Sequence, residues 1–419
     1  MTVLNTLKIM RFRNVEPGTT LRFRNGYNIL LGKNATGKTT LLELIGNAIS
    51  LDLSDYAWEP FKIEFQLTSN TRTMRVEAEN ARVADADSVD HAYVHGVRPH
   101  ELGGRANVVI EEAGRTLLRY TVDGATVDIQ APGQQPRTYP LRFPIFGDNL
   151  LLPVLFATSH RQFAGDSYSL IQPFRIFRLV RFDESLAFFE RITTESRIHL
   201  WFEPNGAVRG FGSLAPVAVA TLVAKAVKHR ASLATVEIAD LPLLAKLNSL
   251  LGFRAASLYV ERLEKIAATE DAMEQADYGH FRFAFTRHDG SVIDHSRLSY
   301  GQKRLLAFHF WLATFEDFAV ADELVNGLHH EWISSSIEAL EGRQSFLTTQ
   351  HPLLLDYLQF NTEHEVVDSF ILCKSTTPVA GPERMRWANI SEKDGCAFYR
   401  AYKAGIEHVS EILVSRGLW

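Results

Sequence analysis

The residues best suited to chemistry are the glycines, the lysine and the threonines of the segment GKNATGKTT, Gly32 to Thr40. The segment fits the pattern G-x-x-x-x-G-K-[ST], follows the apolar run Tyr27 to Leu31, and precedes the amphipathic stretch TTLLELIGNAI. Its glycines let backbone N–H groups turn inward around phosphate oxygens, and the N-terminus of the following helix adds partial positive charge. In this pattern Lys38 reaches the β- and γ-phosphate oxygens and Thr39 is a ligand of Mg²⁺. The segment therefore predicts a loop that binds nucleotide phosphates.

A second set of chemical groups follows two later apolar runs. FAVADE supplies Asp322 followed at once by Glu323, and SFLTTQHP contains Gln350 and His351. Beside a phosphate loop, we expect Asp322 to hold Mg²⁺ through water and Glu323 to act as general base toward the attacking water. Either Gln350 or His351 would hydrogen-bond the γ-phosphate. Solvated surface acids and a solvent-facing histidine are the structural alternatives.

The segment LSYGQKRLL, Leu298 to Leu306, begins a predicted helix at Ser299. The dipole at a helix N-terminus favours negative charge, so this helix could receive a phosphate, with Lys303 and Arg304 in support. A helix capped by a serine side chain is the structural alternative.

A third charged pattern, FRIFRLVRF, spaces Arg175, Arg178 and Arg181 among aromatic residues. Such a run could grip the phosphates and stack the bases of a nucleic acid. Arginines that extend over a hydrophobic surface while their charged ends stay in water are the simpler explanation, and we favour it.

Strands and helices must position these residues, and they alternate at both ends of the chain. Residues from about 61 to 146 are strand-rich and predict an antiparallel β flap on the first lobe, and LLPVLFATSHRQF predicts an apolar strand. The stretch with LPLLAKLNSLLGF and LYVERLEKIAATEDAMEQA is mostly helical in pattern. We therefore predict an α/β fold with an N-terminal lobe over 1–163, a helical insertion over 164–278 and a C-terminal lobe over 279–419. The strands of the two lobes should share one sheet.

Composition limits the kinds of protein this chain can be. Its 419 residues are 46% hydrophobic and 22% charged with a net charge of −5, which suits a globular protein and gives no general electrostatic reason to coat nucleic acid. Two cysteines are too few for a disulfide framework or a zinc site, and no signal peptide opens the chain, so we expect a cytoplasmic protein. The apolar run Leu214 to Val227 meets Lys225 before it reaches membrane-spanning length, so we expect no membrane partner.

Together these motifs resemble the ABC-type ATPase superfamily, and within it the SMC, RecF and OLD-like branch. The resemblance covers about the first fifty residues and the segment from 151 to about 358, and it implies a P-loop ATPase head that uses ATP and Mg²⁺. It implies that the nucleotide is bound by the Walker A residues Gly32, Asn34, Gly37, Lys38, Thr39 and Thr40 and by the signature residues Ser299, Gly301 and Gln302. It further implies that Asp322 and Glu323 are the Walker B pair, that Asn326 to His329 form the D-loop, and that Gln350 or His351 is the switch residue.

Two more assignments follow from position within that family. Arg13 stands where SMC-like proteins often place an arginine near the nucleotide, and Gln162 in SHRQF resembles the Q-loop glutamine that contacts nucleotide and metal. Gln66 is the alternative Q-loop residue. One departure is Tyr300, which stands where a second glycine is usual and could reshape the approach to the γ-phosphate.

The resemblance also implies how the protein acts. In this superfamily each ATP lies between the P-loop of one protomer and the signature of another, so ATP would join two copies and hydrolysis at Glu323 would release them. Stand-alone chains of this build resemble ATPase subunits of bacterial anti-phage defence systems such as PARIS or Septu. This implies a homodimer or higher homo-oligomer that senses or regulates a separate effector, a nuclease or a toxin.

A RecF-like DNA-binding clamp in DNA repair is the alternative, and it would bind nucleic acid directly. A transporter subunit is disfavoured, because a long insertion separates the P-loop from the signature.

Overall fold

The computed structural model describes residues 1–81, 104–123, 126–133, 135–140, 150–151, 166–174, 179–183, 185–202, 207–228, 233–263, 274–376 and 382–418. Gln162, most of LLPVLFATSHRQF, Arg175 and Arg178 lie outside these residues. The chain divides into two compact units. The first consists of Met1–Arg181, Val320–Asp322 and Gln344–Trp419, and the second of Phe182–Ala319 and Glu323–Arg343. No helix in the described ranges is both long enough and apolar enough to cross a membrane.

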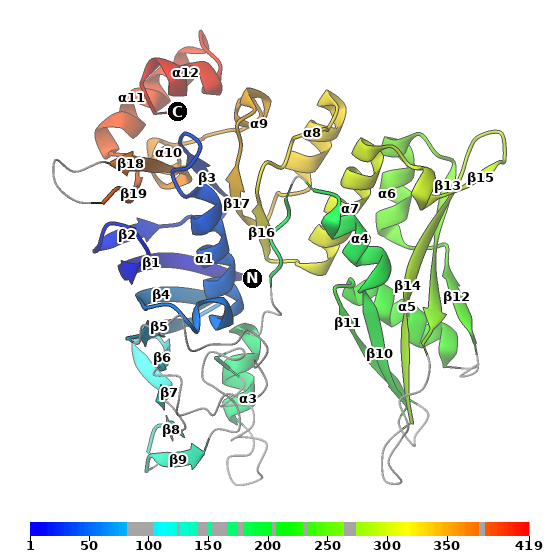
Figure 1. The fold of residues 1–419 in the computed structure, drawn as a ribbon, viewed down its shortest axis with the longest axis horizontal. Coiled ribbons are helices and arrows are strands. Elements are labelled where there is room, and N and C mark those ends of the chain that lie inside the picture. Colours follow the sequence, from blue (N-terminus) through cyan, green and yellow to red (C-terminus); the bar gives the residue numbers. More distant parts are fainter. Residues whose placement is uncertain are drawn as a thin grey trace. The chain divides into compact units, whose positions relative to one another are not determined.

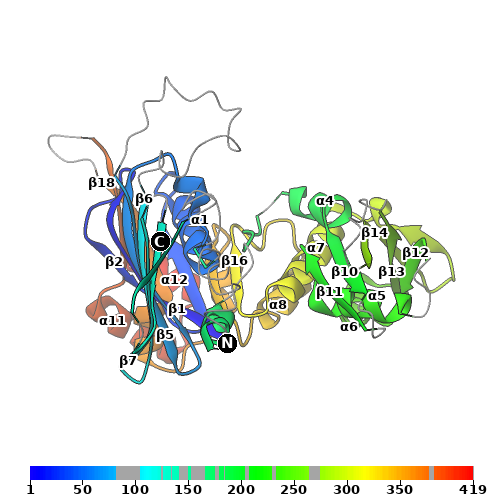
Figure 2. The ribbon, with the colours of Figure 1, turned by 90° about the horizontal axis from the view of Figure 1, so that it is seen from below.

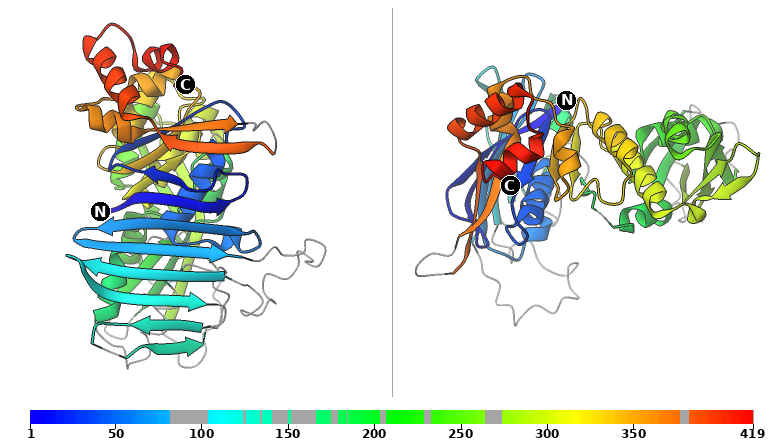
Figure 3. Two further views of the ribbon diagram at one scale, coloured as in Figure 1. Left: turned by 90° about the vertical axis from the view of Figure 1, so that its left-hand side faces the viewer. Right: turned by 90° about the horizontal axis from the view of Figure 1, so that it is seen from above.

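The first unit contains an eight-stranded sheet in the order β2-β1-β4-β5-β6-β7-β8-β9, visible as a ladder in Figure 3. Its strands are β1 (Thr2–Phe12), β2 (Thr19–Arg22), β4 (Phe61–Ser69), β5 (Arg72–Asn80), β6 (Gly104–Glu112), β7 (Arg115–Asp123), β8 (Thr126–Gln130) and β9 (Arg137–Pro140). All neighbouring strands are antiparallel, and alternate residues of β4 are buried, as expected for a sheet with one covered face.

The predicted flap is therefore corrected in its placement. Its strands exist, but they form no separate layer on the first lobe, because β4 pairs with β1 from Thr2 opposite Ser69 to Phe12 opposite Phe61. The ladder of backbone hydrogen bonds continues outward from that pair through β5 to β9. The β-rich region thus extends the N-terminal sheet.

A five-stranded sheet in the order β16-β17-β3-β18-β19 carries the loop that follows β3. Its strands are β3 (Tyr27–Leu31), β16 (Phe318–Ala321), β17 (Gln344–Thr348), β18 (Phe370–Thr376) and β19 (Arg384–Asn389). Strands β17 and β18 run parallel to β3, with Tyr27 opposite Ser345. The prediction that strands from the two ends of the chain share one sheet is confirmed.

Helix α1 (Lys38–Ser50) begins directly after the loop and lies across the eight-stranded sheet (Figure 1). Nearly every residue from Leu41 to Ser50 is buried, so the helix is packed on more than one side. The remaining helices of this unit are α3 (Asp166–Ile171), α9 (Pro352–Asp356), α10 (Glu363–Ser369), α11 (Glu392–Ala404) and α12 (Val409–Ser415). Phe360, Phe370, Phe398 and Tyr402 pack their rings together and join α11 to β18.

The buried amide of Gln344 links the two sheets of the first unit. Its Oε1 accepts from the Leu4 N–H at 2.8 Å, and its Nε2 donates to the carbonyls of Leu4 at 2.8 Å and Arg24 at 2.9 Å. A side-chain amide thus supplies the hydrogen bonds that a neighbouring strand would give. Removing it would leave buried backbone groups without partners, at a cost of about 1–3 kcal/mol.

The second unit is built on a six-stranded antiparallel sheet in the order β11-β10-β14-β13-β12, with β15 paired to β14. Its strands are β10 (Arg197–Phe202), β11 (Val208–Ser213), β12 (Thr235–Ile238), β13 (Ala255–Arg262), β14 (Glu274–Thr286) and β15 (Val292–Asp294). Its helices are α4 (Ala187–Thr194), α5 (Val217–Val227), α6 (Pro242–Leu251), α7 (Tyr300–Thr314) and α8 (His330–Glu338). Helices α5 and α6 pack on this sheet (Figure 2).

The prediction of a helical insertion over 164–278 is wrong in its secondary structure. Helix α6 forms where LPLLAKLNSLLGF predicts it, but LYVER, expected to be helical, belongs to β13. Ala256, Leu258 and Val260 of that strand are buried alternately, because α6 covers only one face of the sheet there. The insertion is therefore an α/β layer of sheet and helices.

Candidate functional site

The loop after β3 has the backbone geometry that its glycines predict. Gly32 has φ 152°, and a Cβ there would lie 2.2 Å from the Cys373 carbonyl oxygen of β18. Gly37 precedes α1 with φ 80°, and a Cβ there would lie 2.3 Å from Met385 Sδ. Only glycine fits both positions, since the first is crowded by backbone and the second combines a left-handed conformation with a close side chain.

Residues of β19 hold the loop in shape. The Trp387 indole N–H donates to the Thr36 carbonyl at 3.0 Å, and Thr36 Oγ1 donates to the Lys33 carbonyl at 2.8 Å. Trp387 is almost fully buried. Sequence reasoning did not identify Met385 or Trp387, because they lie some 350 residues beyond the loop and carry no motif of their own.

The Lys38 side chain is hydrogen-bonded to the loop that precedes it. Its Nζ donates to the carbonyls of Gly32 at 2.7 Å and Lys33 at 3.0 Å, and the side chain is buried. An ammonium group has three N–H donors, so these two bonds orient it with one more donor available. Asn34 and Thr39 are exposed and Thr40 is half-buried, which places three predicted nucleotide-binding residues within reach of solvent.

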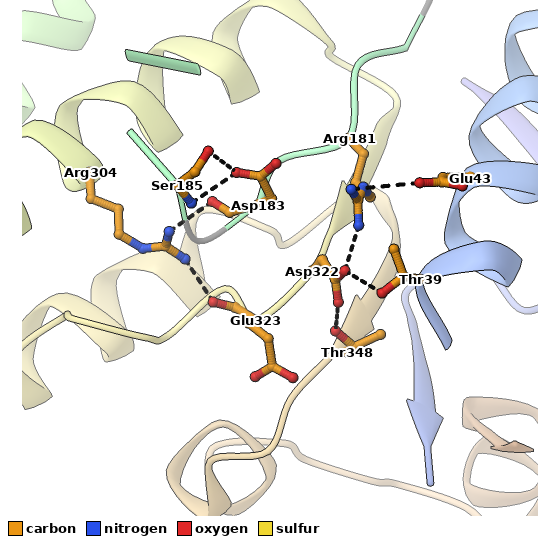
Figure 4. A network of polar contacts seen from close by, with 9 residues as sticks. All are labelled: Thr39, Glu43, Arg181, Asp183, Ser185, Arg304, Asp322, Glu323 and Thr348. Carbon is orange, nitrogen blue, oxygen red and sulfur yellow. Dashed lines mark hydrogen bonds and ion pairs between the residues drawn. The ribbon is translucent and has the colours of Figure 1, made fainter. Parts of the chain in front are cut away.

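Asp322, at the end of β16, is the centre of a polar network in the first unit (Figure 4). Its Oδ2 accepts from Thr39 Oγ1 at 2.7 Å, and its Oδ1 accepts from Thr348 Oγ1 at the end of β17. The carboxylate is 15% exposed. The structure thus brings together Thr39 and Asp322, which sequence analysis proposed separately as residues that hold Mg²⁺.

Arg181 completes this network. Its Nη1 lies 2.5 Å from Asp322 Oδ2, and its Nη2 lies 3.7 Å from the Glu43 carboxylate on α1. Sequence reasoning considered Arg181 only as a phosphate-gripping or surface-covering arginine, so its position beside Asp322 was missed. The two residues are 141 positions apart, and no sequence signal joined them.

The oxygen groups of Thr39 and Asp322 match the donors that Mg²⁺ prefers. The hydroxyl that donates to Asp322 keeps lone pairs for a metal, so one threonine and one carboxylate can serve together. The donor set therefore fits a magnesium ion that would take its remaining ligands from phosphate and water. The positive charge of Arg181 on the same carboxylate oxygen is the one feature that opposes it.

Gln350 and His351 both lie just after β17 and are exposed. His351 caps α9, since its Nδ1 accepts from the Leu353 N–H at 3.3 Å, and its own N–H donates to Thr349 Oγ1 at 2.9 Å. The choice between the two as switch residue stays open.

Arg13 is engaged with another residue. Its Nε and Nη2 donate to the two carboxylate oxygens of Glu59 at 2.9 and 2.8 Å, and this hydrogen bonding raises the pKa of the guanidinium above its ordinary value. The ring of Tyr56 lies 5.7 Å from the guanidinium. Gln66 sits within β4, opposite Thr6 of β1 and Arg75 of β5. The roles of Arg13 and Gln66 toward nucleotide stay predictions.

In the second unit, Ser299 is the N-cap of α7. Its Oγ accepts from the Gln302 N–H at 3.3 Å, and Gln302 Oε1 accepts from the Ser299 N–H at 2.9 Å, which forms a capping box. The capped helix that sequence analysis gave as the alternative is therefore present. A cap and a phosphate site are compatible, because both need an exposed serine at a helix N-terminus.

The predicted signature and D-loop segments contact each other within the second unit. A Cβ at Gly301 would lie 2.9 Å from the Gly327 carbonyl and 3.0 Å from the Trp332 ring. Gly327 has φ 74° and lies against the ring of Tyr300, which is 47% exposed. Tyr300 thus packs on the backbone at Gly327, within the predicted D-loop, where a glycine would leave space.

Arg304 is buried in the second unit, at 1% exposure. Its guanidinium donates to the carbonyls of Asp183 at 2.7 Å, Glu323 at 2.7 Å and Leu324 at 3.0 Å, and Figure 4 shows these carbonyl contacts to Asp183 and Glu323. The expectation that Arg304 supports a phosphate at Ser299 is wrong, because its guanidinium is buried and hydrogen-bonded to backbone carbonyls. It instead fixes the chain at Glu323, which has a φ of 50° that non-glycine residues rarely adopt.

No protein-family model matches the chain, and no curated protein matches it. Among solved structures, it is similar to SMC head domains. One, bound to the C-terminal winged-helix domain of ScpA, shares 13% identity over 93% of this chain and 98% of that chain, with a TM-score of 0.41. The SMC head domain from Thermotoga maritima shares 12% identity over 93% and 99% of the two chains, with a TM-score of 0.34. An SMC head from Pyrococcus furiosus, bound to the C-terminal domain of ScpA, shares 11% identity over 96% of this chain and 100% of that chain, with a TM-score of 0.39.

Proposed function

We propose that this protein binds and hydrolyses Mg-ATP as an ABC-type ATPase of the SMC, RecF and OLD-like branch. The observation that carries the proposal is the hydrogen bond from Thr39, in the first turn after the phosphate loop, to Asp322 at the end of β16. A phosphate loop binds phosphate, but a loop threonine paired with a strand-end aspartate is the arrangement that a nucleotide-bound Mg²⁺ needs.

Each residue has a distinct task in this proposal. The loop backbone and the N-terminus of α1 bind the α- and β-phosphates, and Lys38 neutralises charge on the β- and γ-phosphates. Thr39 and Asp322 would hold Mg²⁺, which supplies Lewis-acid stabilisation of the phosphate oxygens. Glu323 accepts the proton of the attacking water, and Gln350 or His351 hydrogen-bonds the γ-phosphate.

We further propose that two copies pair around ATP. Ser299 and Gly301 stand at the exposed N-terminus of α7, and the helix dipole there favours a phosphate supplied with another copy's P-loop. Binding of ATP then favours the dimer, and hydrolysis removes the γ-phosphate that links the copies.

The test of nucleotide binding compares two lysines of one loop. Lys38→Ala should weaken ATP binding by at least about tenfold, because a charge-assisted contact to phosphate is lost. Lys33→Ala is the matched control, since its side chain is exposed and only its backbone carbonyl contacts Lys38. Titration of a fluorescent ATP analogue measures both. Equal affinity of Lys38→Ala and wild type would reject the proposed site.

The biological role rests on the family resemblance alone. We propose a cytoplasmic ATPase that senses infection and regulates a separate nuclease or toxin in anti-phage defence. Cells that express this chain with its gene neighbours should resist phage, and Lys38→Ala should remove the resistance. Equal plating of phage on both strains would argue against this role, and salt-dependent DNA binding by the protein alone would point to a repair clamp.

A further inference from the structure

Arg181 occupies the carboxylate that the proposed function assigns to the metal. Its Nη1 lies 2.5 Å from Asp322 Oδ2, the same oxygen that accepts from Thr39 at 2.7 Å (Figure 4). The arginine side chain is 24% exposed and the carboxylate 15%, so solvent screens the pair only in part. A positive charge therefore lies at the oxygen that a divalent cation would approach.

Glu43 gives Arg181 a second anion. Its carboxylate lies 3.7 Å from Nη2 and is 43% exposed. Thr39 and Glu43 are four residues apart in α1, so they share one face of the helix. Because a guanidinium presents five N–H groups in a planar fork, it can keep Glu43 while it releases Asp322.

The backbone beside Arg181 is anchored. The Leu179 N–H donates to the buried Ser50 Oγ of α1 at 2.7 Å, and Leu179 itself is buried. An exchange of partners is therefore a movement of the Arg181 side chain alone. Thr348 continues to hold the other carboxylate oxygen of Asp322 during such an exchange.

We propose that the guanidinium of Arg181 competes with a divalent metal ion for the Asp322 carboxylate, an inference that rests on the proposed function. In the metal-free protein it neutralises the carboxylate and keeps it aligned between Thr39 and Thr348. When metal binds, the guanidinium leaves Asp322 and remains on Glu43. Metal affinity is thus set by the exchange of one cation for another, which favours a metal that arrives with the added binding energy of a nucleotide.

The experiment measures Mn²⁺ binding to the full chain by electron paramagnetic resonance, without nucleotide and again with ADP. Arg181→Met keeps the length of the side chain and removes its charge, so Mn²⁺ should bind tighter by on the order of tenfold. Arg181→Lys keeps the charge and should stay within about threefold of wild type. Glu43→Gln removes the alternative partner of Arg181, so Mn²⁺ should bind more weakly by roughly threefold.

Equal or weaker Mn²⁺ binding by Arg181→Met would overturn the proposal, because Arg181 would then only position Asp322. If that variant fails to fold, Glu43→Gln decides: unchanged or tighter binding is the overturning result. The double variant should bind Mn²⁺ as Arg181→Met does. A further loss from Glu43→Gln in that background would mean that Glu43 ligates metal itself, against the exchange.

The failure of this inference and of the proposed function are distinguishable. If ATP binding depends on Lys38 but Arg181→Met leaves Mn²⁺ affinity unchanged, the proposed function stands and only the exchange of Arg181 for metal is rejected. If the wild-type protein binds no ATP but Arg181→Met binds Mn²⁺ more tightly than wild type, the competition at Asp322 stands and the proposed nucleotide site is rejected.

Discussion

At the scale of single residues, His309 gives the protein a pH dependence that is separate from its chemistry. This residue of α7 is 4% exposed and its Nε2 has no hydrogen-bond partner among the described residues. Burial, together with the nearby positive charges of Lys246 and Arg343, lowers the pKa of His309 to about 4. The folded state therefore keeps the imidazole neutral where the unfolded chain binds a proton.

The sign of the effect follows from this lowered pKa. Above pH 6.5, the ordinary pKa of histidine, neither the folded nor the unfolded state binds the proton, so His309 does not reduce the free energy of unfolding. As the pH drops from 6.5 toward about 4, the unfolded state binds the proton and the free energy of unfolding falls. At about pH 5 the loss should be about 2 kcal/mol. His309→Phe should remove this loss, as measured by urea unfolding at about pH 5 and pH 7.5. A variant as pH-sensitive as wild type would mean that His309 titrates normally in the fold.

Site residues could be predicted from the sequence where they belong to a short motif of neighbouring positions. The glycines, Lys38 and Thr39 form one motif, and Asp322 directly follows an apolar run, so a role toward nucleotide or metal could be predicted for each of them, whereas the hydrogen bond between Thr39 and Asp322 is a finding of the structure. Arg181 could not, because its partner is far away along the chain and its neighbours suggested a surface role. Arg304 was misjudged for a related reason: a charged residue is rarely buried, and its carbonyl partners cannot be read from side-chain types.

At the scale of elements, the N-terminus of α7 can be tested for two functions at once. Ser299 caps the helix, and Ala at an N-cap costs about 1 kcal/mol, whereas Asp caps as well as Ser. Ser299→Ala should therefore lower the free energy of unfolding by about 1 kcal/mol. Ser299→Asp should leave stability unchanged, but its charge should repel the phosphate of a second copy and prevent ATP-dependent pairing.

Urea unfolding and ATP turnover separate the two roles. Ser299→Asp with normal stability and impaired turnover supports a phosphate site at this helix. Normal turnover by Ser299→Asp would mean that the helix is capped and nothing more.

Elements were predictable where length and flanking signals agreed. Pro242 begins α6 and Gly252 ends it in a left-handed conformation, which are the start and stop signals of a helix. Strand β13 was mistaken for a helix, because Tyr259 and Leu263, four residues apart, also fit a helical spacing and the run is short. Burial of one sheet face by α6 decided between the two patterns, and that contact is tertiary.

At the scale of the whole molecule, the predicted motifs belong to different units. The P-loop, Asp322 and Thr348 lie in the first unit, and Ser299, Gly301 and Glu323 lie in the second. The chain passes from one unit to the other between Asp322 and Glu323, the proposed metal-binding acid and general base. Sequence analysis predicted the sharing of one sheet by the two ends of the chain, but not this division, which depends on the density of contacts.

The pairing of two whole chains is best tested with Glu323→Gln. Loss of a general base typically slows reaction by about 10²–10⁴-fold, so this variant should bind Mg-ATP and stay in the ATP state. Light scattering should give the chain mass of 47.2 kDa without nucleotide and about twice that with Mg-ATP. Lys38→Ala, which should not bind ATP, is the matched control and should remain a monomer under both conditions. If Glu323→Gln binds ATP and its mass does not change, the helix N-terminus at Ser299 does not act on a second copy, and hydrolysis must be completed within one chain or by another protein.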